Sequence, residues 1–98
     1  MRKPRFSESN RVTFSVATIS ATQCAAAQGL LSWTQDDLAQ NAQVARATIA
    51  SFEGKARIKP MQKNLLAIIA VFQAAGVAFV SEDVEHGLGA GVRLASSN

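Results

Sequence analysis

The apolar side chains of residues 34–54, TQDDLAQNAQVARATIASFEG, follow a helical period whose phase changes once, between Ala42 and Val44. A single helix keeps one phase, so this change predicts two short helices joined by a tight turn. Ala39 is small and Ile49 is β-branched, which lets the two helices cross closely at a steep angle. We therefore expect a helix-turn-helix, a unit that places its second helix in a major groove.

Polar residues mark where two helices begin. Ser20 and Gln23 have the spacing of a capping box, which predicts a helix that starts after Ser20. Thr34 followed by Asp37 predicts the start of the next helix, at the beginning of the two-helix unit. Two helix boundaries are thus predicted from local chemistry alone.

The first of these helices is rich in alanine and extends to about residue 31. We expect Leu30 and Leu31 to contribute to the core, and Gly29 to mark a close approach by a neighbouring element. Cys24 is the only cysteine, so an internal disulfide is excluded and the side chain is expected to pack as a small hydrophobe.

The second helix of the two-helix unit is predicted at residues 45–53. If Ile49 and Phe52 point inward, four short or hydrogen-bonding side chains face outward: Arg46, Ala47, Thr48 and Ser51. Short side chains permit close approach to base edges, and arginine can donate two hydrogen bonds to guanine O6 and N7. The alternative is an ordinary solvated face, although such faces carry more Lys and Glu than this one. Asp36, in the preceding helix, is expected to face sideways or away because its charge opposes phosphate.

Positive charge follows this helix. Residues 54–63 contain no acidic side chain and four basic ones, Lys55, Arg57, Lys59 and Lys63. Nine of the ten Lys and Arg lie in residues 1–63, and the net charge is +3. The uneven charge suggests a basic working face that contacts phosphates, with a solvated surface that has no partner as the alternative.

Further along the chain, a helix is predicted after Pro60 and is expected to end at Gly76 in a left-handed cap. Residues 77–80 and 92–94 are predicted strands. They can form a hairpin, pair with a strand predicted at residues 12–16, or join the strands of a second subunit. We favour pairing between subunits, because it would also fix the spacing of two base-contacting helices.

The chain is divided by these predictions into a basic arm and short strand at residues 1–19, a helix-turn-helix domain at 20–76, and C-terminal dimerisation strands at 77–98.

With 98 residues, 48% of them hydrophobic, a binding module is favoured over an enzyme. No nucleophile, base and orienting group converge, and no metal or cofactor is expected, since His86 has no Cys or His companion. No membrane segment is predicted, so a cytoplasmic location is expected.

Several of these residues also resemble a known family. Gln35, Leu38, Val44 and Ile49, with the run Phe52-Glu53-Gly54, resemble the lambda-repressor-like (Cro/cI, XRE-type) helix-turn-helix of bacterial regulators. The resemblance extends over about residues 20–95.

The resemblance implies a mainly α, compact four- to five-helix lambda-repressor-like DNA-binding domain with short flanking β-strands. It further implies a homodimeric regulator of transcription, most often a repressor, that binds double-stranded DNA at a partly palindromic operator. Base contacts would come from Arg46, Ala47, Thr48 and Ser51, and phosphate contacts from Thr34, Gln35, Lys55 and Arg57.

The chain departs from the family pattern at two positions. Gln43 occupies the turn where the family has glycine, so a non-glycine residue is expected in a left-handed conformation at a cost of roughly 1 kcal/mol. Ala45 stands where the family often has serine, so one helix cap is expected to be missing. A different class of function stays open: an antitoxin or antiactivator that uses the same scaffold to bind a protein partner, with residues 77–80 as a pairing edge.

Overall fold

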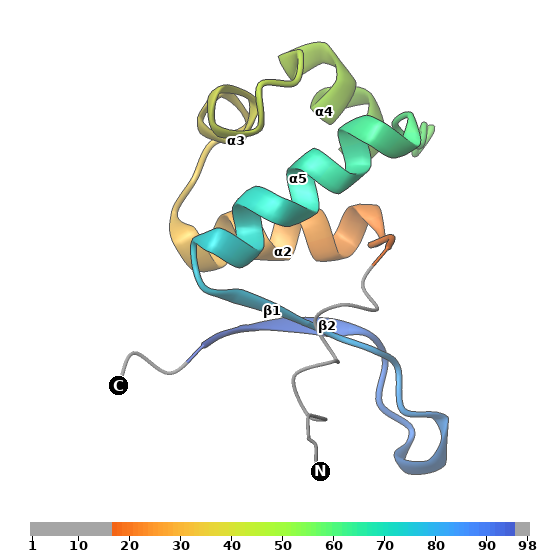
Figure 1. Cartoon of the computed structure of the whole chain (residues 1–98). Coiled ribbons are helices and arrows are strands. Elements are labelled where there is room, and N and C mark those ends of the chain that lie inside the picture. The colour runs from red at the N-terminus through yellow and green to blue at the C-terminus, as the bar shows by residue number, and fades with distance from the viewer. Residues whose placement is uncertain (1–16, 96–98) are drawn as a thin grey trace, which may run out of the picture.

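A computed structural model describes residues 17–95 of the chain, so the predicted arm at 1–11 and strand at 12–16 lie outside the described residues. The described part is mainly helical, as expected, with a small two-stranded sheet. Its elements, shown in Figure 1, are α2 (Ala21–Leu31), α3 (Gln35–Ala42), α4 (Arg46–Glu53), α5 (Gln62–Ala74), β1 (Val77–Val80), the 3-10 turn η1 (Val84–His86) and β2 (Gly91–Leu94).

Both predicted capping boxes are present. The backbone N–H of Gln23 donates to Ser20 Oγ over 3.0 Å, and Ser20 N–H donates to Gln23 Oε1 over 2.9 Å. The same reciprocal pair joins Thr34 and Asp37, at 3.0 and 2.9 Å. Each pair satisfies two backbone N–H donors that a helix start would otherwise leave free, and so fixes where α2 and α3 begin.

The turn between α3 and α4 has the backbone that comparison with the family pattern leads us to expect. Gln43 adopts the left-handed conformation, with φ 57° and ψ 45°. Ala45 is the N-cap residue of α4 and makes no side-chain capping bond. The reversal between the two helices is therefore made by a strained non-glycine residue and an uncapped helix start.

The core lies where α2, α3, α4 and α5 meet. Its largest fully buried side chains come from all four of these helices: Phe72, Leu38, Ile49, Leu65, Ile68 and Cys24. Trp33 packs against this cluster and stacks on Phe72 with ring centroids 5.7 Å apart. The tryptophan is thus a packing residue that holds the α2–α3 junction against α5.

Two expectations for α2 are wrong. Leu30 is 39% exposed, and the buried side of the helix carries Cys24, Ala27 and Gln28. Leu31, in contrast, packs against the core as expected. Nothing lies within 4 Å of a Cβ placed on Gly29, so no neighbour requires glycine there. The physical reason is that a helix with alanine on most sides has no clear apolar stripe, so its rotation is set by its neighbours.

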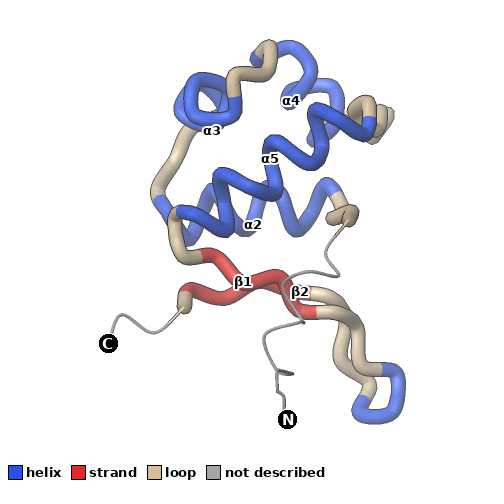
Figure 2. The backbone as a smooth tube through the Cα atoms, in the orientation of Figure 1, coloured by secondary structure: helices blue, strands red, loops and turns tan. Residues whose placement is uncertain are grey.

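The two C-terminal strands pair with each other as an antiparallel hairpin, with Val77 opposite Leu94 and Val80 opposite Gly91 (Figure 2). The hairpin is one of the three pairings that the sequence left open, and pairing of its outer edges with a second subunit stays a prediction. Phe79 and Val92 pack against the core, and the Phe79 ring meets Phe72 edge-on at 6.0 Å. A hairpin is marginal alone, so this packing against the helices stabilises it.

The elements are arranged with α3 and α4 at one end, the hairpin at the other, and α2 and α5 between them (Figure 1). The described chain begins beside the start of α5, where the side-chain amide of Gln62 donates to the Ala17 carbonyl over 3.0 Å, and it ends after β2. In residues 17–95, no helix combines the length and the apolar character that crossing a bilayer requires.

Candidate functional site

The four residues predicted to contact bases all lie on α4, at its start and along its outer side. Ile49 and Phe52 are buried, which turns the opposite side of the helix outward. Arg46, Ala47 and Ser51 are exposed there, and Thr48 is half-buried. Because Ala47 and Ser51 are one helical turn apart, the outer side of α4 presents a surface of short side chains, with one long cationic side chain at its N-terminal end.

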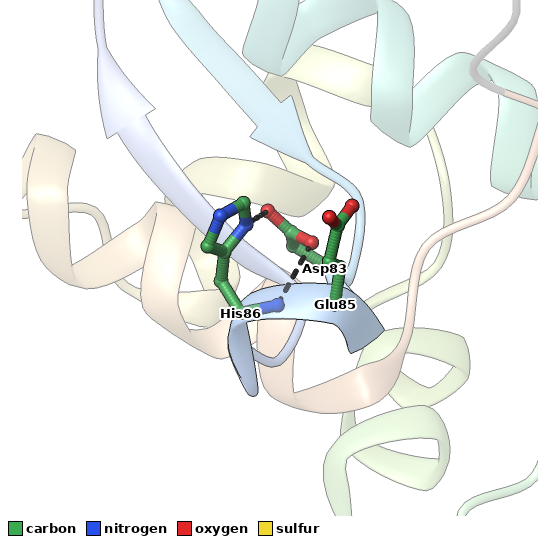
Figure 3. A group of neighbouring side chains, drawn as sticks. All are labelled: Asp83, Glu85 and His86. Atoms are coloured by element: carbon green, nitrogen blue, oxygen red, sulfur yellow. Dashed lines mark hydrogen bonds and ion pairs between the residues drawn. The ribbon is translucent and has the colours of Figure 1, made fainter.

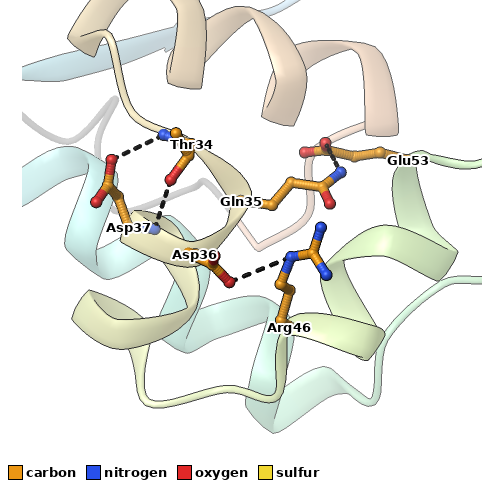
Figure 4. A network of polar contacts seen from close by, with 6 residues as sticks. All are labelled: Thr34, Gln35, Asp36, Asp37, Arg46 and Glu53. Carbon is orange, nitrogen blue, oxygen red and sulfur yellow. Dashed lines mark hydrogen bonds and ion pairs between the residues drawn. The ribbon is translucent and has the colours of Figure 1, made fainter.

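Arg46 is held from α3. Its Nε lies 3.2 Å from Asp36 Oδ1, and both side chains are well exposed, at 61% and 70% (Figure 4). An exposed pair of this kind adds little to folding stability. Its effect is geometric, since contact through Nε leaves the two terminal nitrogens of the guanidinium outside the ion pair. Asp36 therefore lies beside the predicted base-contacting arginine, which is the sideways placement among the two that the sequence analysis expects.

A second contact joins the beginning of α3 to the end of α4. The side-chain amide of Gln35 donates to Glu53 Oε1 over 3.0 Å (Figure 4). Gln35 is half-buried, so this bond braces α4 along its inner side. The phosphate contact predicted for Gln35 stays a prediction.

Glu53 brings a carboxylate close to the core. Its Oε2 atom is buried and has no hydrogen-bond partner among the described residues. Burial raises the pKa of the Cys24 thiol well above its usual range, and the neighbouring Glu53 carboxylate raises it further. Cys24 is therefore a protonated, inert thiol at neutral pH, as expected for a residue that packs as a hydrophobe.

The predicted phosphate-contacting residues lie at the start of α3 and in the segment after α4. Thr34 is exposed and its Oγ1 accepts the capping bond from Asp37 N–H. Lys55 and Arg57 are exposed in the loop that leaves α4. This loop is tied back to the helix by a backbone bond of 3.1 Å from Ile58 N–H to the Ser51 carbonyl. The basic segment at residues 54–63 is thus held against α4.

A groove of about 320 Å³ lies between α4 and this loop. Ala47, Thr48 and Ser51 line one side, and Ile58 and Met61 contribute to the other. Neither Ile58 nor Met61 was predicted from the sequence to be a site residue. The signal was present, because both are large apolar residues within a basic segment, but their exposure could not be deduced from the pattern.

A separate polar cluster lies at the hairpin tip. Asp83, Glu85 and His86 have potential ligand atoms within 4.8 Å of one another (Figure 3). Asp83 accepts from the backbone N–H of His86 and contacts its ring at Nδ1, 2.8 Å away. These two contacts account for the placement of Asp83 and His86 as a capped 3-10 turn, in which His86 is exposed.

Comparison of the chain with protein-family models and with curated proteins gave no match.

Proposed function

We propose that this chain is a homodimeric, sequence-specific DNA-binding regulator of transcription, with a lambda-repressor-like helix-turn-helix formed by α3 and α4. The observation that carries the proposal is the outer side of α4. It begins with a cation held by α3 and continues with small side chains, and it is adjoined by a basic loop.

Direct base contact needs both close approach and directed hydrogen bonds. Ala47 and Ser51 are small enough for the α4 backbone to enter a major groove, where each base pair presents a distinct pattern of donors and acceptors. The Asp36 contact at Nε leaves the terminal nitrogens of Arg46 to donate to guanine O6 and N7. Thr48 and Ser51 add hydroxyl groups that pair with either donors or acceptors.

Phosphate contacts position such a helix without carrying sequence information. The exposed side chains of Lys55, Arg57, Lys59 and Lys63 supply positive charge in the segment that follows α4. Thr34, at the start of α3, offers a hydroxyl and lies at the positive end of a helix dipole. These groups would bind any duplex and set the position from which α4 contacts bases.

The dimer is supported by the hairpin. The sheet in residues 17–95 has two strands, so each strand pairs on one side only. Unpaired strand edges favour the addition of another strand, and a second copy would supply the same edge under two-fold symmetry. A dimer formed through β1 or β2 would bind two half-sites at a fixed spacing.

Selection of bound sequences from random duplex DNA tests the proposal. We expect a partly palindromic motif, and the spacing of its halves reports the dimer. Arg46→Ala is expected to weaken the selected site by about 1–3 kcal/mol and to relax preference at one base pair. Lys55→Ala should weaken all duplexes about equally. Unchanged binding by both variants, or the absence of any selected motif, contradicts the proposal.

A protein-interaction function, as an antitoxin or antiactivator, is favoured by the same unpaired strand edges. Salt separates the two functions, because DNA binding falls steeply as salt rises, through release of counterions from phosphate. A complex formed by strand addition depends on backbone hydrogen bonds and should be much less sensitive. Association with a protein partner that persists at high salt, without specific DNA binding, would favour this second function.

A further inference from the structure

The groove between α4 and the following loop combines features that a phosphate-binding surface does not need. Ile58 is 59% exposed and Met61 is 67% exposed, although both are large apolar side chains. They lie across the groove from Ala47, whose methyl group belongs to the outer side of α4. The groove therefore begins at the proposed base-contacting face and has apolar side chains on both of its walls.

The charge around this groove limits its occupant. Lys59 lines the groove itself, and residues 54–63 contain three further cations and no acidic side chain. An apolar protein surface would bury these cations without partners, which is unfavourable. A polyanion that also presents apolar groups satisfies both the cations and the exposed side chains of Ile58 and Met61.

Duplex DNA presents such a group in its major groove. The C5-methyl of thymine is the apolar feature by which this groove distinguishes T·A from C·G, and it is contacted by side chains such as alanine and other apolar residues. The methyl projects from the base edge toward the protein, close to the phosphates of its own strand. A site that contacts it therefore needs apolar atoms beside cations.

We propose that this groove receives the C5-methyl group of a thymine in the operator half-site, and that Ile58 and Met61 are specificity-determining residues that contact it together with Ala47. The proposal rests on the proposed function and extends it, since it assigns recognition of an A·T pair to side chains outside α4.

Substitution of single thymines by deoxyuridine tests this directly, because the two bases differ by that methyl group alone. The probe is the duplex selected from random DNA by the full chain, with each thymine of one half-site replaced in turn. At one position we expect about fourfold weaker binding, the fold-change that corresponds to burial of one methyl-sized group at ~0.8 kcal/mol. Other positions should change little.

Two variants connect the effect to the groove. Ile58→Asn and Met61→Gln each replace the apolar side chain with an amide of similar size, and neither changes the charge. In either variant we expect the ratio of dissociation constants for the deoxyuridine and thymine duplexes to fall toward one at the sensitive position. The matched control is Leu88→Gln, which changes a similarly exposed apolar side chain (61%) in the distant hairpin and should keep the parental ratio.

The possible results separate the two proposals. Specific binding in which no thymine is sensitive to loss of its methyl group overturns the thymine contact and leaves the proposed function intact. A sensitive thymine whose ratio is unchanged in Ile58→Asn and Met61→Gln also overturns the assignment to the groove. If the parent chain selects no motif, the proposed function fails and the thymine contact fails with it.

Discussion

Gln43 adopts a backbone conformation that glycine adopts without strain, so Gln43→Gly is expected to stabilise the fold. With φ at 57°, the Cβ atom of Gln43 is crowded against the backbone. Relief of this crowding is worth roughly 1–2 kcal/mol. Against it stands the greater freedom that glycine gives the unfolded chain, roughly 0.4–1 kcal/mol. The Gln43 side chain is exposed, so no buried contact is lost.

The net expectation is an increase of about 0.5–1 kcal/mol in the free energy of unfolding, or about 3–6 °C in Tm for a domain of this size. Urea and thermal unfolding, followed by circular dichroism and by the fluorescence of Trp33, measure it. Trp33 is a suitable probe because it is the only tryptophan and stacks on Phe72 in the core.

The matched control is Gln40→Gly, an exposed position inside α3. It removes the same side chain and adds the same freedom to the unfolded chain, but its native backbone is helical, so we expect a loss of about 0.5–1 kcal/mol. Opposite signs for the two variants support the left-handed turn. Equal destabilisation by both would refute the argument, because it would mean that Gln43 carries no strain in solution.

Three further predictions concern α3, the ion pair and the buried thiol. Thr34→Ala should lower the free energy of unfolding by about 1 kcal/mol, measured by urea unfolding, because Asp37 N–H loses its capping partner; no change would contradict the cap. Asp36→Asn should increase binding to all duplexes, because a negative charge is removed. It should also lower the ratio of specific to non-specific affinity, because the ion pair no longer positions Arg46. Competition titrations measure this ratio, and an unchanged value would mean that the ion pair does not position Arg46. Burial raises the folded-state pKa of Cys24. Above about pH 8.5 the unfolded chain therefore loses the thiol proton while the folded chain keeps it. The free energy of unfolding should then fall by up to about 1.4 kcal/mol per pH unit. Urea unfolding of the parent and of Cys24→Ala between about pH 8 and pH 10 tests this, since the variant lacks the thiol and should show a weaker dependence.

Features set by neighbouring residues could be predicted from the sequence. The capping boxes at Ser20 and Thr34 involve residues three positions apart, so their chemistry is visible in the chain itself. The position of the turn at Gln43 was also predictable, because the apolar pattern changes phase between Ala42 and Val44. These local signals located the start of α3 and both limits of α4 to within one residue of those observed.

Features that depend on distant packing could not be predicted. The rotation of α2 was wrong at Leu30 because alanine on most sides of a helix leaves several faces equally suitable for burial. The choice among three strand pairings required the position of α5, which brings Val77 to the core. The partners of Arg46 and Gln35 likewise depend on how α3 and α4 cross, a relation that residue spacing does not determine.

Gln23 connects two parts of the molecule that are far apart in sequence. Its side-chain oxygen belongs to the cap of α2, while its amide nitrogen lies 3.2 Å from the Gly91 carbonyl and 3.5 Å from the Val80 carbonyl. One side chain thus links the first turn of α2 to the Val80–Gly91 pair, where the β1–β2 ladder ends. Local opening at either place breaks bonds at the other, so amide protons in both should exchange with solvent together. A chain that docks on the hairpin would thereby stiffen α2, which packs against α4. Assembly at one end of the molecule could in this way affect the candidate site at the other end.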